Sequence, residues 1–379
     1  MNRDTARKGA PARVLIIGGY GNFGGYIARA LAGDGNIRVL IGGRSGEKAA
    51  AAAASLAAAN PAEGHALDID GDIAGSLAAI APDIVIHTTG PFQSQDYRVA
   101  QVCIAQRCHY VDLADARSFV AGIGALDAAA RAAGVLVVSG ASSVPCLTAA
   151  VIDDYLPRFA RLDSVDYGIS AAQQTNRGLA TAASVLSYVG QPFEALQDGA
   201  MQTSHGWQNL HGEQYPELGL RLFGDCDIPD LALFPARYPT LQTQRFCAGH
   251  QVKLLHLGTW ALSWVVRMGV IKSLSPYAER LLRLSFLFDR FGSGRSGFHV
   301  ILKGQGHDGC ALEERFFMIA RSSHGPNIPC IPAILLARRL AAGGIEQRGA
   351  TPCLDLITLA DYLTALEGLD ISVVRETVG

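Results

Sequence analysis

The sequence has few charged residues and almost no net charge. Asp, Glu, Lys and Arg make up 17% of the 379 residues, and the formal net charge is -2 at pH 7. Such a chain has no global field that would attract nucleic acid or an anionic membrane. Hydrophobic residues make up 49% of the sequence, which excludes a mainly disordered chain. The length predicts two domains rather than one.

Paired cysteines and zinc-type ligand spacings are also missing. The eight cysteines are scattered, none forms a Cys-x-x-Cys pair, and the histidines show no paired spacing. We therefore expect no metal site and a reducing compartment. The N-terminal stretch MNRDTARKGAPAR is polar and basic, and the apolar run after it is too short for the core of a signal peptide. These features predict a cytoplasmic protein.

A long uninterrupted apolar segment is absent as well. The most apolar stretch, residues 254–271, is interrupted by His256 and Arg267. A membrane span needs about 20 predominantly apolar residues. The stretch therefore predicts a buried or interface helix, with membrane contact as the alternative.

Strand-like and helix-like segments alternate up to about Ser139. The strand-like runs are RVLIIG, IRVLIGG, GHALDI, DIVIHTT, CHYVDL and GVLVVSG. Between them lie Ala-rich stretches with helical spacing. This alternation predicts an α/β fold with a Rossmann-like doubly wound parallel sheet, whose near-continuous apolar strands need cover on both faces.

The pattern changes after SGASSVPC. Pro145 suits the start of a helix that CLTAAVIDDYL continues. SVDYGIS alternates like a half-buried strand, and FHVILKGQGHDGCALEERFFMIAR predicts a hairpin that turns at Asp308-Gly309. Residues 207–238 give no clear pattern, and the C-terminal stretches PAILLARRLAAGG and LDLITLADYLTALEGL have helical spacing. We therefore expect a second, α+β domain with a largely antiparallel sheet.

The glycine-rich stretch after the first strand has the context of a dinucleotide-binding loop. It fits G-x-G-x-x-G between a predicted strand and a predicted helix. Glycines there permit a tight turn, close approach of backbone to a diphosphate and close helix packing, and the helix N-terminus favours the negative charge. The alternative is a structural turn without a ligand. The predicted cofactor-binding residues of this loop are Gly18, Gly19, Tyr20, Gly21, Asn22, Phe23 and Gly24.

The end of the second strand indicates which dinucleotide is bound. An NAD site places an acidic residue there, about 20 residues after the glycines. Here Gly42 and Gly43 occupy that place and Arg44 follows, with Ser45 and Lys48 nearby. Because a guanidinium can bond a 2′-phosphate that a carboxylate would repel, the sequence predicts NADP(H). The alternative is a solvated arginine at a helix start.

The loop after the fourth strand is expected at the same edge of the sheet. Ligands of doubly wound sheets bind beyond the carboxyl ends of strands near the reversal of strand order. This places TTGPF near the ribose and nicotinamide, although Gly-Pro is also an ordinary turn. The residues concerned are Thr88, Thr89, Gly90, Pro91 and Phe92.

Taken together, the glycine loop, GGR, TTGPF, YVDL, GASSVP and GPNIPCIPAILLARRLAAGG resemble the saccharopine dehydrogenase-like family. The resemblance covers about the first 150 residues well and about the last 50 more loosely. It implies an NADP-binding Rossmann domain, a second α+β domain inserted before C-terminal helices that return to the first, and an oxidoreductase. The residues after Asp112 and the pair Cys146-Leu147 depart from the family's pattern, which counts against saccharopine itself as the substrate.

These expectations fix the predicted domains. Residues 1–145 are expected to form the NAD(P)-binding Rossmann domain, completed by C-terminal helices in residues 326–379. Residues 146–325 are expected to form an α+β domain for substrate binding or dimerisation. A homodimer is possible, because the sheet of this domain must cover one apolar face.

Five residues are candidates for the chemistry. Tyr110 and Asp112 end the fifth strand near the expected nicotinamide, and Asp112 serves either as an acid/base or as a carboxylate that braces the loop. Ser142 or Ser143 is a further candidate proton donor or acceptor in the same region. Cys146 at a helix start is a candidate nucleophile, with buried packing as the alternative.

The predicted function is an NADP(H)-dependent oxidoreductase that transfers hydride to or from a small amino- or keto-acid-like substrate. Two alternatives stay open: a non-catalytic NADP-binding protein whose ligand controls assembly or partner binding, and a membrane-associated member that uses residues 254–271. The second domain offers arginines that could pair with a substrate carboxylate, namely Arg177, Arg221, Arg237 and Arg295.

Overall fold

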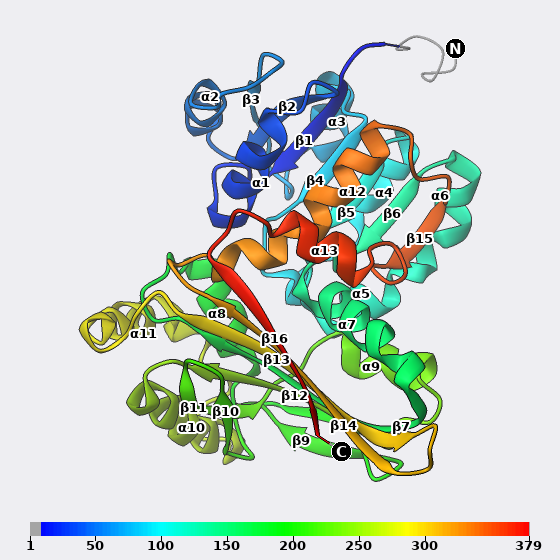
Figure 1. Cartoon of the computed structure of the whole chain (residues 1–379). Helices are drawn as coiled ribbons and strands as arrows, with labels where there is room; N and C mark the ends of the chain where they lie inside the picture. Colours follow the sequence, from blue (N-terminus) through cyan, green and yellow to red (C-terminus); the bar gives the residue numbers. More distant parts are fainter. Residues whose placement is uncertain (1–8, 379) are drawn as a thin grey trace. The chain divides into compact units, whose positions relative to one another are not determined.

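The six aliphatic runs of the N-terminal part form parallel strands, and a seventh strand joins them from near the C-terminus. The computed structural model describes residues 9–378 (Figure 1). The strands are β1 (Ala12–Ile17), β2 (Ile37–Gly43), β3 (Glu63–Ala66), β4 (Ile84–His87), β5 (His109–Asp112), β6 (Leu136–Ser139) and β15 (Gly349–Pro352). Their order is β15-β6-β5-β4-β1-β2-β3, and all neighbours run parallel. The predicted Rossmann-like sheet is confirmed, and β15 is an addition that the sequence did not reveal.

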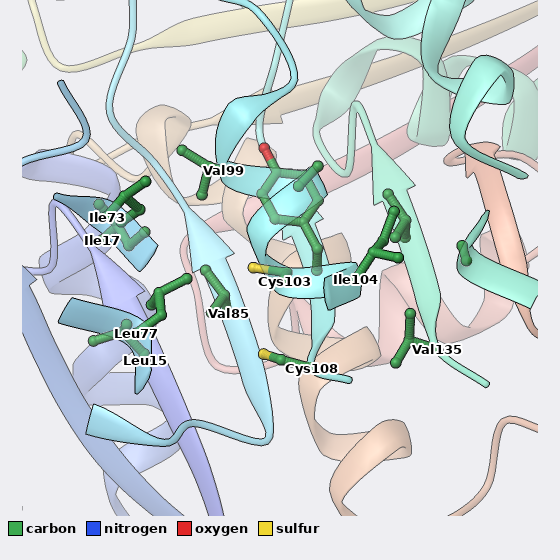
Figure 2. Close-up of a cluster of buried hydrophobic side chains, with 14 of the residues drawn as sticks. Leu15, Ile17, Ile73, Leu77, Val85, Val99, Cys103, Ile104, Cys108 and Val135 are labelled. Carbon is green, nitrogen blue, oxygen red and sulfur yellow. The ribbon is translucent and has the colours of Figure 1, made fainter. Parts of the chain in front are cut away.

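Helices cover both faces of this sheet. They are α1 (Asn22–Ala32), α2 (Gly46–Ala54), α3 (Ile73–Ile80), α4 (Arg98–Ala105), α6 (Asp127–Ala133) and α12 (Ile331–Ala341). On one face, Leu15 of β1 and Val85 of β4 point toward Leu77 of α3 and Cys103 of α4 (Figure 2). The alternate strand residues, such as Ile16, are equally buried on the opposite face, where α1 and α12 pack together. The aliphatic strands thus have the cover that a parallel sheet requires.

The second unit contains a mixed sheet in which one pair of strands is parallel. Its strands are β7 (Phe159–Ala171), β8 (Pro192–Gln197), β9 (Ala200–His205), β10 (His211–Tyr215), β11 (Gly219–Asp225), β12 (Thr243–His250), β13 (Ser296–Gly306), β14 (Ala311–Ala320) and β16 (Ile371–Val378). The main order is β10-β11-β12-β7-β13-β14-β16, and β8 pairs with β9 separately. Only the β12–β7 pair among these described strands is parallel, so the predicted, largely antiparallel sheet is confirmed.

The second unit also contains helices. They are α5 (Arg117–Ala121), α7 (Thr148–Tyr155), α8 (Leu179–Tyr188), α9 (Asp230–Arg237), α10 (Lys253–Arg267), α11 (Ala278–Phe286) and α13 (Leu359–Ala365). The sequence predicted those at α7, α10 and α13, but not the others. The hairpin around Asp308-Gly309 is present, and Gly309 has a φ of +81° that suits glycine at its turn. The apolar stretch at 254–271 forms α10, and within residues 9–378 no helix is both long and apolar enough to cross a membrane.

The chain passes between the two units more often than the sequence suggested. The first unit comprises residues up to Ala114, Gly122–Ser143 and Pro329–Ile357. The second comprises Asp115–Ala121, Val144–Ile328 and the chain from Thr358 onward. The assignment of all of 326–379 to the first domain is therefore corrected, because β16 pairs with β14 in the second sheet. A local helical pattern could not reveal this long-range pairing.

Candidate dinucleotide site

The glycine loop is built from close backbone contacts that side chains would prevent. Gly18 directly follows β1 and has a φ of +81°. A Cβ atom on Gly18 would lie 2.7 Å from Thr88 Oγ1, and one on Gly24 would lie 2.3 Å from the carbonyl oxygen of Gly18. The chain therefore turns tightly off the strand and brings α1 against it, as the G-x-G-x-x-G pattern predicts.

The start of α1 offers backbone N–H groups to an anion. Gly21 is the N-cap, it provides no side-chain cap, and the first turn of α1 contains no acidic residue. The first N–H groups of a helix have no acceptor within the helix, and the helix dipole favours negative charge there. Gly21 and Asn22 are exposed, and Phe23 is half-buried, so this end suits a diphosphate.

The loop after β2 lies next to the glycine loop. The ring of Tyr20 covers Gly43 so closely that a Cβ atom there would lie 2.3 Å from the ring. The backbone N–H of Ser45 donates to Tyr20 Oη at 3.3 Å, and the Ser45 hydroxyl accepts from the N–H of Lys48 at 3.2 Å. Arg44 and Lys48 are exposed. The exposed Arg44 and the predicted phosphate loop thus share one edge of the sheet.

Arg44 also lines a hollow of about 600 Å³. The hollow continues to Asp68 and Asp72, which follow β3 and precede α3. It lies at the carboxyl ends of the strands, where doubly wound sheets bind ligands. A smaller hollow of about 390 Å³ lies at the opposite ends of β1 and β2, beside Arg13 and Arg38, and we assign no cofactor to it.

The TTGPF loop is fixed against the glycine loop. The Thr88 N–H and hydroxyl both donate to the carbonyl oxygen of Ile17, at 3.0 and 2.8 Å. Gly90 and Pro91 are exposed, whereas Phe92 is buried. Phe92 packs edge-on against His87 at 5.0 Å between ring centroids, so its ring belongs to the interior of the unit.

His87 is a buried residue of this site that the sequence reasoning missed. One ring nitrogen, Nε2, lies 2.7 Å from Thr89 Oγ1, and the other, Nδ1, lies 3.0 Å from Tyr110 Oη. Burial lowers the pKa of His87 to about 3, so the ring is neutral near neutral pH. A histidine at the end of an otherwise aliphatic strand was the available signal. Its contacts hold Thr89 of the TTGPF loop.

Asp112 joins the loops that follow β5 and β6. Its Oδ1 accepts from the N–H groups of Ala114 and Gly140 at 2.9 and 2.8 Å and from the Ser139 hydroxyl at 3.0 Å. Complete burial outweighs these bonds and raises the pKa of Asp112 to about 6. Tyr110 is equally buried, and burial raises its pKa well above the usual range. These contacts support the bracing alternative for Asp112.

The other chemical candidates lie around the next turn of the chain. Ser142 is half-buried and Ser143 is buried, and both belong to the first unit. Cys146 belongs to the second unit, in the turn that precedes α7, and its exposed fraction is 3%. Such burial favours the packing alternative over a nucleophile.

Two of the four candidate arginines already pair with carboxylates of the same unit. Arg177 bonds Asp289 at 2.5 Å and Arg237 bonds Asp153 at 2.7 Å. Arg221 is buried and Arg295 is exposed. Arg177 and Arg237 are therefore weaker candidates than Arg221 and Arg295 for binding a substrate carboxylate.

The second sheet brings together a group of metal-type ligands that sequence spacing could not reveal. Donor atoms of Asp166, His211 and Cys247 all lie within 4.8 Å of one another. However, the guanidinium of Arg245 pairs with Asp166, and its positive charge opposes a cation. We therefore assign no metal to this cluster.

The fold and the glycine loop define a dinucleotide-binding protein of the Rossmann class. Residues 14–138 match the family model described as "Saccharopine dehydrogenase NADP binding domain". The chain is thus saccharopine dehydrogenase-like in its N-terminal third, and the predicted family resemblance and cofactor class are confirmed at the level of this domain. No curated protein sequence matches the chain.

One solved structure shows a similar fold over nearly the whole chain. Apo saccharopine dehydrogenase (L-Glu forming) from Saccharomyces cerevisiae is 12% identical and has a TM-score of 0.66, with 97% of this chain and 100% of that chain covered. Amine dehydrogenase from Mycobacterium smegmatis (12% identity, 91% and 95% covered) and biliverdin reductase from Synechocystis sp. PCC 6803 (13% identity, 94% and 96% covered) give TM-scores of 0.45 and 0.42. The first likeness establishes the fold.

Proposed function

We propose that this protein is an NADP(H)-dependent oxidoreductase that acts on a small amino- or keto-acid-like substrate. The observation that carries the proposal is a single sheet edge that combines the glycine loop, the uncapped start of α1 and Arg44, within the matched NADP binding domain. Each part suits one portion of the cofactor: backbone N–H groups suit the diphosphate, and the guanidinium suits the 2′-phosphate.

The chain's own residues would bind and orient the cofactor. The exposed Gly21 and the uncapped start of α1 suit a diphosphate close to the backbone, and the hollow beside Arg44 fits the adenosine end. Thr88, tied to Ile17, would place the TTGPF loop beside the nicotinamide ribose. When bound, the nicotinamide supplies the hydride, and placement of its ring against the substrate carbon is the protein's main contribution.

The binding step is tested by Arg44→Glu. Because the charge reversal replaces attraction to the 2′-phosphate by repulsion, we expect NADPH affinity to fall by about 30-fold or more and NADH affinity by less than about threefold. Isothermal titration calorimetry measures both. Arg38→Gln, at the opposite end of β2, is the control and should leave both affinities within about twofold. Equal losses for both cofactors in Arg44→Glu would refute the assignment of Arg44.

A non-catalytic NADP-binding protein is the second candidate. This candidate is favoured by the burial of Tyr110 and Asp112, because Tyr110 Oη and Asp112 Oδ1 form hydrogen bonds inside the first unit. The two candidates differ in turnover. A catalyst should oxidise NADPH in the presence of at least one small keto acid, or reduce NADP+ with an amino acid. A protein that binds NADPH tightly and shows no turnover across such a panel would support the second candidate.

A further inference from the structure

Large apolar side chains are exposed on two neighbouring helices of the second unit. Leu254, Leu257 and Trp264 lie on α10, and Met268 is its C-cap. Leu284 and Phe286 lie on α11, and Leu287 and Phe291 follow it. The exposed fractions of Met268, Leu287 and Phe291 are 67%, 67% and 64%. Large exposed apolar patches usually mark interaction sites, and these two helical segments expose eight large apolar side chains.

The exposed side chains follow helical spacing. Residues 254, 257, 264 and 268 lie on one side of α10, whereas His256, Ser263 and Val266 on the other side are buried. The buried sides of α8, α10 and α11 contribute to one apolar core, through Val185, Leu262 and Leu281. These three helices (Figure 1) therefore share one core, and each also exposes apolar side chains to solvent.

Positive charge surrounds these apolar side chains. Residues 253–295 contain seven Lys or Arg but only two Asp or Glu, although the whole chain has more acidic than basic residues. All seven are exposed: Lys253, Arg267, Lys272, Arg280, Arg283, Arg290 and Arg295. The guanidinium of Arg267 lies over the Trp264 ring at 5.0 Å, and that of Arg290 lies over Phe291 at 4.6 Å. The chain thus concentrates cations where it exposes aromatic and aliphatic groups.

We propose that α10 and the α11 segment, residues 253–268 and 278–291, form a surface that binds anionic lipid bilayers. Amphipathic helices with basic and aromatic residues lie in the plane of a membrane interface, where apolar side chains enter the acyl boundary and cations contact anionic headgroups. A second copy of the chain fits less well. A two-fold interface places the same patch against itself, so the five cations of this surface would face five, and the cores of protein interfaces are depleted of charge.

Vesicle flotation tests the proposal with the full chain. We expect the protein to float with phosphatidylcholine vesicles that contain phosphatidylglycerol, and to stay at the bottom with phosphatidylcholine alone. The bound fraction should fall as salt is raised, because exposed charges are screened. Equal flotation with neutral and anionic vesicles, or none with either, would overturn the proposal.

Two variants and a matched control locate the surface. Leu284→Ser/Leu287→Ser/Phe291→Ser removes apolar groups, and Arg280→Glu/Arg290→Glu reverses charge. Each should lower partitioning to anionic vesicles by about tenfold or more. Met201→Ser/Leu210→Ser/Leu220→Ser removes three apolar side chains that are exposed elsewhere in the second unit and should bind vesicles like the wild type. A cooperative thermal transition close to that of the wild type shows that the second unit of each variant is folded. If the wild type instead forms a dimer that the first variant dissociates, and no vesicle is bound, the surface is an interface between copies.

Discussion

Asp112 and His87 show how burial decides the properties of single residues in this protein. Both side chains lie within the first unit, out of contact with water. Burial disfavours the charged form of each group, so it raises the pKa of the carboxyl to about 6 and lowers that of the imidazole to about 3. The two shifts have opposite consequences for stability. Lowering the pH destabilises the folded protein through His87, because the unfolded chain takes up that proton more readily. It stabilises the folded protein through Asp112, because there the folded state holds the proton more tightly.

The Asp112 effect is measurable with Asp112→Asn. The folded protein holds the carboxyl proton up to about pH 6, whereas the unfolded chain loses it near pH 4. Raising the pH through this window therefore destabilises the wild type but not the variant. We expect the free energy of unfolding of Asp112→Asn, relative to wild type, to rise by about 3 kcal/mol between about pH 4 and pH 7 and then level off. Urea denaturation at several pH values measures it.

Asp127→Asn is the comparison for this experiment. The hydrogen bond from Arg131 lowers the pKa of the half-buried Asp127. The wild type therefore gains stability from this pair as the pH rises. The free energy of unfolding of Asp127→Asn, relative to wild type, should accordingly fall with rising pH. If the difference in free energy of unfolding between Asp112→Asn and wild type does not change with pH, burial does not shift the pKa of the Asp112 carboxyl.

At the scale of elements, the packing of α1 against β1 requires glycine where the two backbones are in contact. Gly24 approaches the carbonyl oxygen of Gly18, whereas Gly33 at the end of α1 has no atom within 4 Å of a Cβ position and a φ of -77°. The same substitution should therefore have opposite results at the two ends of one helix.

Gly24→Ala forces α1 away from β1. We expect it to lower the free energy of unfolding by about 2–4 kcal/mol and NADPH affinity by about tenfold or more. Gly33→Ala should leave affinity unchanged and stability equal or higher by about 0.5 kcal/mol. Thermal melting and NADPH titration of both proteins provide the measurements. Similar behaviour of the two variants would contradict the close packing of the glycine loop.

At the scale of the whole molecule, the chain shares its C-terminal part between the two units. Residues Pro329–Ile357 add α12 and β15 to the first unit, and α13 and β16 then belong to the second. Val374 of β16 packs against a core cluster that includes Phe317 and Tyr215. The last strand is thus an edge strand that protects β14 from solvent.

Removal of β16 should therefore affect one unit and spare the other. A chain that ends at Asp370 is expected to melt at lower temperature and to aggregate more readily, because β14 becomes an exposed edge. NADPH affinity should stay within about twofold of wild type, since the cofactor residues lie in the first unit. Val374→Asp provides a milder version of the same test. Loss of NADPH binding in a folded Val374→Asp protein would contradict the division of the units.

The sequence by itself determined the features that depend on neighbours along the chain. Aliphatic runs, helical spacing, the glycine loop and Arg44 are local patterns, and they predicted the six parallel strands and the cofactor class. The turn at Asp308-Gly309 is local in the same sense. Only the tertiary structure decided the addition of β15 and β16, the contacts of His87 with Thr89 and Tyr110, and the exposure of one side of α10. These depend on pairing and burial between residues far apart in the sequence, which no local periodicity encodes.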